Sequence, residues 1–152
     1  MAVTTSTFPP ATAMAHRVTF EHPDQVTISL VGPFIASEAQ AIVNRIHELG
    51  REHGPMFWLI DVSRFENSGE RVRDVFIKGA GEHYPIRAGV MCGAPFALRV
   101  AMMMALTAGA RIKPKSFSFP FEFTATEEQA RAWIEGKRAS MTSTHARELC
   151  AS

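Results

Sequence analysis

Cysteine and net charge are both scarce in this chain of 152 residues. The two cysteines are Cys92, in an apolar run, and Cys150, in the polar C-terminal region, and this pair builds no disulfide framework. Such cysteine usage suits a reducing compartment. The formal net charge is +1, with acidic and basic residues mixed along the whole length. We therefore expect no nucleic-acid partner, because such a partner requires a concentrated basic footprint.

Long apolar runs and targeting signals are absent as well. The longest apolar run, residues 100–110, contains Thr107 and Gly109 and falls far short of the ~20 residues of a membrane span. Residues 1–16 lack the basic flank and apolar core of a signal peptide, and their Thr, Ala and Pro content predicts a disordered leader. We expect a cytoplasmic protein with no membrane span.

The chain does contain a regular alternation of strand and helix patterns. Residues 17–21 and 26–31 alternate apolar and polar side chains on either side of a turn, which predicts an antiparallel hairpin. Capping boxes at Ser37 and Thr126, and a proline at residue 95, mark helix starts. Further strands are predicted over residues 56–62, 86–92 and 117–123, and helices over residues 37–53, from 68 to about 81, 95–110 and 126–138.

This order, β-β-α-β-α-β-α-β-α, predicts an α/β fold with a mixed, mainly parallel sheet and helices packed on it. One domain would cover residues 17–138, followed by a polar and mobile C-terminal tail over residues 139–152. Pro120 lies within the last strand pattern and removes a backbone donor, so that strand is expected at an edge of the sheet.

Residues 57–70 (FWLIDVSRFENSGE) combine an apolar strand that ends in Asp-x-Ser, a short loop and a Ser-Gly pair. This pattern and the element order resemble the STAS domain, typified by bacterial anti-sigma-factor antagonists. Residues 94–99 (APFALR) and 123–134 (FTATEEQARAWI) resemble the SpoIIAA-like subgroup, a fold also compared with lipid-binding Sec14 domains. The resemblance implies a non-enzymatic regulatory module with protein partners, such as a kinase or an anti-sigma-like regulator.

Ser68 is the candidate regulatory phosphosite that this resemblance implies, because STAS switch proteins are phosphorylated on a serine at the start of the helix after that strand. Asn67 stands where the family typically has an aspartate. A phosphate on Ser68 would meet free N–H groups at a helix N-terminus, with Arg64 and Arg71 close in sequence. The alternative is that Ser68 only caps the helix, a role worth ~1 kcal/mol.

The carboxyl ends of parallel strands are where such sheets bind ligands. Asp61, Ser63, Arg64 and Cys92 offer side-chain chemistry there and form a candidate cleft. No histidine is placed by sequence to activate Ser63 or Cys92, and the six histidines complete no metal-ligand pattern, so we expect no catalytic residue, metal or cofactor. The simpler interpretation makes Asp61 and Ser63 a hydrogen-bonded turn and Cys92 an inert buried thiol.

The helix over residues 95–110 is apolar nearly all round, and Phe96, Met102, Met103 and Leu106 are its candidate interface or ligand residues. One face packs on the sheet, and the rest must meet another helix, a second chain or an apolar ligand. A protein-interaction module, functioning as a homodimer through this helix, is our first hypothesis. The alternative is a carrier of a small apolar ligand or lipid, which requires an apolar pocket of at least ~300 Å³.

Overall fold

The computed structural model describes residues 4–6 and 16–151 of the chain. In this part the elements are β1 (Thr4–Ser6), β2 (Arg17–Glu21), β3 (Gln25–Phe34), α1 (Ala36–His53), β4 (Met56–Ser68), α2 (Val72–Gly79), β5 (Ile86–Cys92), α3 (Phe96–Ile112), β6 (Phe121–Thr124) and α4 (Glu127–Ala151).

All strands join one six-stranded sheet, and their spatial order is their order in the sequence. The pairs β1–β2 and β2–β3 are antiparallel, which confirms the predicted hairpin. The pairs from β3 to β6 are parallel. The α/β fold with a mixed, mainly parallel sheet is confirmed, and β6 lies at an edge, as Pro120 predicted.

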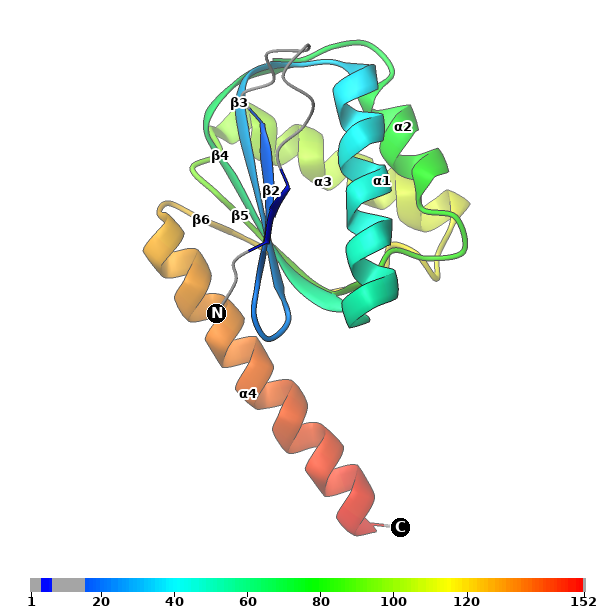
Figure 1. Cartoon of the computed structure of the whole chain (residues 1–152), viewed down its shortest axis with the longest axis vertical. Helices are drawn as coiled ribbons and strands as arrows, with labels where there is room; N and C mark the ends of the chain where they lie inside the picture. Colours follow the sequence, from blue (N-terminus) through cyan, green and yellow to red (C-terminus); the bar gives the residue numbers. More distant parts are fainter. Residues whose placement is uncertain (1–3, 7–15, 152) are drawn as a thin grey trace.

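Helices cover both faces of this sheet (Figure 1). The face beneath α1, α2 and α3 holds the larger core, which includes Trp58, Ile60 and Val62 of β4. The opposite face carries Phe57 and Leu59 of the same strand, which pack beneath α4. Because successive strand residues point to opposite faces, the continuous apolar run of β4 fills both cores.

The predicted leader differs from the structure in two places. Thr4–Ser6 pairs with β2 as β1, where disorder was expected. His16 is buried, and its ring Nδ1 accepts a hydrogen bond of 3.0 Å from the backbone N–H of Val31. Its Nε2 lies 3.2 Å from the carbonyl oxygen of Pro33. The other positions of the predicted leader, residues 1–3 and 7–15, lie outside the described residues.

The strand β4 is longer than predicted, and this changes the position of Ser68. Strand β3 continues to Phe34, which pairs with Ser68, and the N–H of Gly69 donates to the carbonyl oxygen of Phe34 at 2.7 Å. Helix α2 begins only at Val72, after Arg71. The expectation that Ser68 caps the second helix was therefore wrong, because pairing with β3 keeps the chain extended through that residue.

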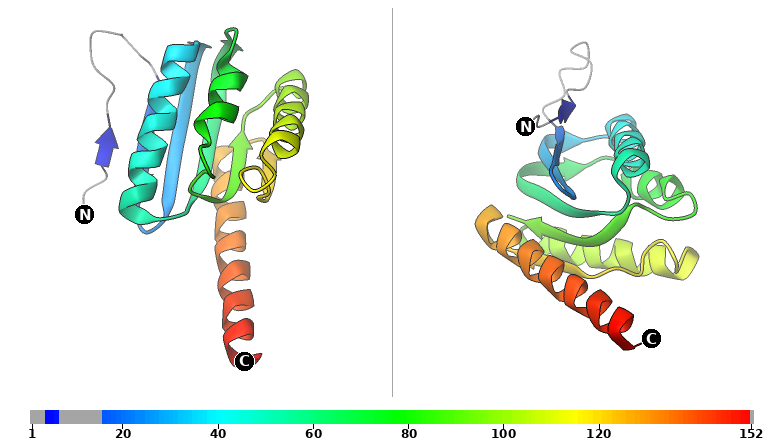
Figure 2. Two further views of the ribbon diagram at one scale, coloured as in Figure 1. Left: turned by 90° about the vertical axis from the view of Figure 1, so that its right-hand side faces the viewer. Right: turned by 60° about the horizontal axis from the view of Figure 1, so that its bottom comes forward.

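The ends of the other helices differ in detail from the patterns. The N–H of Ile35 donates to the Glu38 carboxylate at 3.0 Å, so α1 starts before the predicted box at Ser37. The Thr126 box is confirmed, because the hydroxyl of Thr126 accepts from the N–H of Gln129 at 3.2 Å. Helix α4 continues through the segment predicted as a tail, since residues 139–151 contain neither proline nor glycine to end it. This second half projects beyond the sheet (Figure 2).

Candidate functional site

Two of the four residues of the predicted cleft, Asp61 and Ser63, are joined by hydrogen bonds within β4. The N–H and the hydroxyl of Ser63 both donate to one carboxylate oxygen of Asp61, at 2.9 Å and 2.7 Å. Asp61 lies opposite Cys92 in the β4–β5 register. A Cβ atom on Gly93, whose φ is +77°, would lie 2.8 Å from the Cβ of Ser63, so the chain just after β5 is in close contact with β4. The cleft over Asp61, Ser63, Arg64 and Cys92 stays a prediction.

The thiol of Cys92 is unsuited to nucleophilic chemistry. Its side chain is buried beneath α4, and this burial, followed by the carboxylates of Asp61 and Glu127, raises its pKa to about 11. The thiolate, which is the reactive form, is therefore scarce at neutral pH. Arg64 is exposed and makes no ion pair within the described part of the chain.

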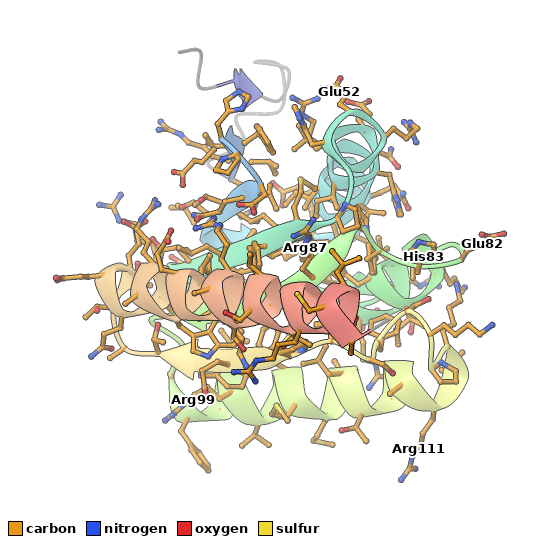
Figure 3. The ribbon with its side chains drawn as sticks, turned by 90° about the horizontal axis from the view of Figure 1, so that it is seen from below. Glu52, Glu82, His83, Arg87, Arg99 and Arg111 are labelled. Atoms are coloured by element: carbon orange, nitrogen blue, oxygen red, sulfur yellow. The ribbon has the colours of Figure 1, made fainter. Side chains whose placement is uncertain are left out.

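An apolar groove of about 910 Å³ lies along the outer side of α3 and the neighbouring edge strand β6. We call its lining the outer groove. Phe96 is 73% exposed, Met103 49% and Met104 65%. Arg99 and Arg111 lie toward opposite ends of the helix, and Arg111 points away from the sheet (Figure 3). A large apolar surface between polar ends is typical of a surface that binds another molecule.

A second apolar cavity, of about 580 Å³, lies between the sheet, α2 and α3. We call it the inner pocket. Met102 and Leu106 line it, whereas Phe96 and Met103 line the outer groove. The structure therefore divides the predicted interface or ligand residues between two sides of one helix, a division that an all-round apolar pattern cannot reveal.

The deep part of the inner pocket offers little to a polar ligand. Among the residues that line it, the indole N–H of Trp58 donates to the carbonyl oxygen of Pro85 at 3.2 Å. The hydroxyl of Tyr84 donates to the carbonyl oxygen of Phe76. Burial raises the pKa of Tyr84 well above its usual value, so this hydroxyl keeps its proton. Both polar groups are already satisfied by the backbone.

Every charged residue that lines the inner pocket comes from the connection between β4 and the first turn of α2. These residues are Arg71, Arg73 and Asp74, and Ser68 lines the same part. Sequence reasoning placed Arg71 near Ser68 but missed Arg73 and Asp74. Their positions in the first turn of α2 were hidden because that helix was expected to begin four residues earlier, at Ser68.

The described residues were also searched for metal-binding groups and for helices that could cross a membrane. Among residues 4–6 and 16–151, no three His, Cys, Asp or Glu side chains are grouped so that they could hold a metal ion. Within the same residues, none of the helices has the length and apolar character needed to cross a membrane.

Comparison with known proteins places this geometry in a familiar fold. No family model matches the chain, and no curated protein matches its sequence. Solved structures do match, among them an uncharacterized DUF3478-family protein with a SpoIIAA-like fold from Shewanella loihica PV-4 and the anti-sigma factor antagonist SpoIIAA in its unphosphorylated form.

The Shewanella protein is 15% identical with a TM-score of 0.57, and the alignment covers 78% of this chain and 91% of that one. SpoIIAA is 13% identical with a TM-score of 0.58, and the alignment covers 80% and 99%. At these identities the likeness establishes the fold. The chain has a SpoIIAA-like fold, as the STAS resemblance predicted.

Proposed function

We propose that this chain is a non-enzymatic, cytoplasmic regulatory module that binds a protein partner through the outer groove. One observation carries the proposal, namely the row of exposed apolar side chains along α3. Val100 and Ile112, 42% and 64% exposed, extend the surface formed by Phe96, Met103 and Met104. Each Å² of this apolar surface that a partner covers would stabilise the complex by about 25 cal/mol. The shared fold with an anti-sigma factor antagonist supports a partner such as a kinase or an anti-sigma-like regulator.

Site-specific photocrosslinking in cells of the source organism tests this proposal. A photoreactive amino acid at Met104, in the outer groove, should capture a defined protein or a second copy of the chain. The matched control is Thr142, an exposed residue in the half of α4 that projects beyond the sheet. Identical products from both positions, or no product from Met104, would contradict the proposal.

A homodimer is one form that this docking would take. Met103→Glu places a charge in the outer groove, and a dimer formed there should dissociate because the carboxylate would be buried without a partner. Sedimentation velocity over a range of concentrations measures the change, with Thr142→Glu as the control. A wild-type protein that stays monomeric at every concentration would remove the homodimer while leaving other protein partners.

Ser68 remains the candidate regulatory residue in this proposal. Its side chain is exposed at the end of β4, and Arg71 lies three residues further along the chain. Ser68→Glu should change the yield of the partner crosslinked at Met104, whereas Ser68→Ala should leave it unchanged. Because Ser68 does not cap α2, both variants should keep the wild-type melting temperature. Equal yields from the two variants would remove the switch.

The inner pocket favours a second candidate function, a carrier of a small apolar ligand. Its volume of about 580 Å³ exceeds the ~300 Å³ that this hypothesis required. Native mass spectrometry of protein purified from its own host should then show an excess mass that is lost on mild denaturation. Protein with no excess mass that also fails to take up added apolar compounds would contradict the carrier function.

A further inference from the structure

We propose that the inner pocket binds a single-chain amphiphile with one carboxylate, of the fatty-acid type. Its carboxylate would lie at Arg71 and Arg73, and its hydrocarbon chain would lie between the sheet and α3. This inference rests on the second candidate function and is independent of the protein that docks in the outer groove.

The composition of the pocket wall separates a hydrocarbon end from an ionic end. Residues from the sheet, α1, α2 and α3 supply the apolar wall, among them Ile28, Ile42, Met91, Leu98 and Met102. The indole N–H of Trp58 and the hydroxyl of Tyr84 donate to backbone carbonyl oxygens, so neither group is free to donate a hydrogen bond to a ligand. An apolar wall without free hydrogen-bonding groups suits a hydrocarbon chain and disfavours a ligand that is polar throughout.

The charged end carries an excess of one positive charge. Arg71 and Arg73 line the pocket together with Asp74, and none of the three forms an ion pair within the described residues. A guanidinium group binds a carboxylate through two parallel hydrogen bonds. One carboxylate would balance the excess charge, whereas a doubly charged phosphate would exceed it. The charge complementarity therefore favours a head group with a single negative charge, such as a carboxylate.

The backbone at Arg71 supports a binding role for this residue. Its φ is +68°, and it is the only residue other than glycine with a positive φ among those that the structure describes. A bulky residue in this conformation is under strain, and such strain is concentrated at functional sites. This conformation immediately precedes α2, and the Arg71 side chain lies on the lining of the pocket.

Tryptophan fluorescence offers a direct test, because Trp58 lines the pocket and Trp133 belongs to α4 on the other face of the sheet. In a Trp133→Phe protein, Trp58 is the sole tryptophan. Titration with ω-bromododecanoate, below its micelle concentration, should quench Trp58 saturably through the bromine atom. The uncharged ω-bromododecanol should bind at least tenfold more weakly, and ω-bromobutyrate, which has the carboxylate without the chain, should not quench.

Variants then assign the two ends of the ligand. Arg71→Gln combined with Arg73→Gln should weaken bromododecanoate binding about tenfold or more and leave bromododecanol unchanged. Arg99→Gln combined with Arg111→Gln removes the same charge from the ends of α3 and should leave both affinities unchanged. Ala105→Phe fills the inner pocket and should abolish binding of both compounds, with circular dichroism confirming the fold.

The outcomes separate this inference from the functions above. Equal binding of the carboxylate and the alcohol, or an unchanged affinity in the Arg71 and Arg73 double variant, would overturn the anion site and leave an apolar carrier. Failure of the wild-type pocket to bind either compound would overturn both this inference and the carrier function. Neither result bears on whether a protein docks in the outer groove. If Ala105→Phe does not fold, the arginine variants alone decide the question.

Discussion

The two faces of the sheet are constructed differently, although helices cover both. Beneath α4, the side chains of Phe57, Leu59 and Ile134 have no exposed surface. Beneath α3, the inner pocket of about 580 Å³ separates helix and sheet, and the outer groove follows the other side of the same helix. We call these the closed face and the open face.

Side-chain size and ion pairing account for the difference. On the closed face, Ala88 of β5 and Ala130 of α4 are both fully buried, and their small side chains allow the helix to approach the sheet. The guanidinium of Arg131 pairs with Glu21 at 2.8 Å, and that of Arg138 pairs with Asp24. These pairs attach α4 to the hairpin of β2 and β3.

On the open face, the contacts that attach α3 to the rest of the protein lie mainly near the C-terminal end of the helix. A Cβ atom on Gly109 would lie 2.9 Å from the ring of Phe117, so the chain after the helix packs tightly there. The ammonium group of Lys113 donates to the carbonyl oxygens of Lys78 and Gly81, each at 3.4 Å. The packing beneath α4 is therefore tight throughout, whereas the open face combines the larger core beneath α1 and α2 with apolar surface left uncovered around α3.

The largest effect should come from removing volume on the closed face. Leu59→Ala leaves a cavity beneath α4 and should lower the free energy of unfolding by about 2–5 kcal/mol, as measured by urea denaturation. Met103→Ala removes a side chain of similar size from the outer groove and should change the free energy of unfolding by ~0.5 kcal/mol or less. Equal losses in the two variants would contradict the division into a closed and an open face.

A smaller effect is expected from the ion pair that attaches α4. Arg138 contacts Asp24 at 2.6 Å, and the two side chains are 23% and 18% exposed. Arg138→Gln should cost about 1–2 kcal/mol, because partial burial makes this pair stronger than an exposed one. The loss should shrink at high salt. Arg111→Gln, at the exposed end of α3, is the control. An equal loss of stability in this variant would contradict a special role for the ion pair between Arg138 and Asp24.

The last prediction concerns the two cysteines, whose reactivity should differ without a large change in stability. Iodoacetamide at pH 8 should modify the exposed Cys150 and leave Cys92 unmodified, as peptide mass spectrometry would report. Folding raises the Cys92 pKa from 9.0 to about 11, so the folded state retains a proton that the unfolded state loses. The stability that this thiol contributes should therefore decline as the pH rises above about 9. Rapid modification of Cys92 in the native protein would show that the closed face opens readily.

Much of the fold follows from local patterns. The strand β2 begins and ends at the predicted residues, β5 does so as well, and the Thr126 capping box forms as predicted. These features depend on neighbouring residues, through apolar alternation or a hydrogen bond within one helical turn. The parallel order of the later strands follows from the helices that connect them.

The candidate site was predicted less completely, because its geometry depends on distant segments. The pattern of α3 identified Phe96, Met102, Met103 and Leu106 but not which of them face the sheet. A helix that is apolar all round carries no directional signal. Ser68 was expected to start the second helix, but it ends β4, and the helix begins after Arg71. The segment that pairs with this end of β4 lies in β3, more than thirty residues earlier in the sequence.

The α/β order, the hairpin, the edge position of β6 and the burial of Cys92 could be predicted from the residues alone, because each depends on residue type and local spacing. The extension of β4 to Ser68, the place of Arg71 on the lining of a pocket and the separation of α3 from the sheet could be seen only in the fold. These features arise from contacts between segments far apart in the chain. Their positions follow from how whole elements pack, which no local pattern records.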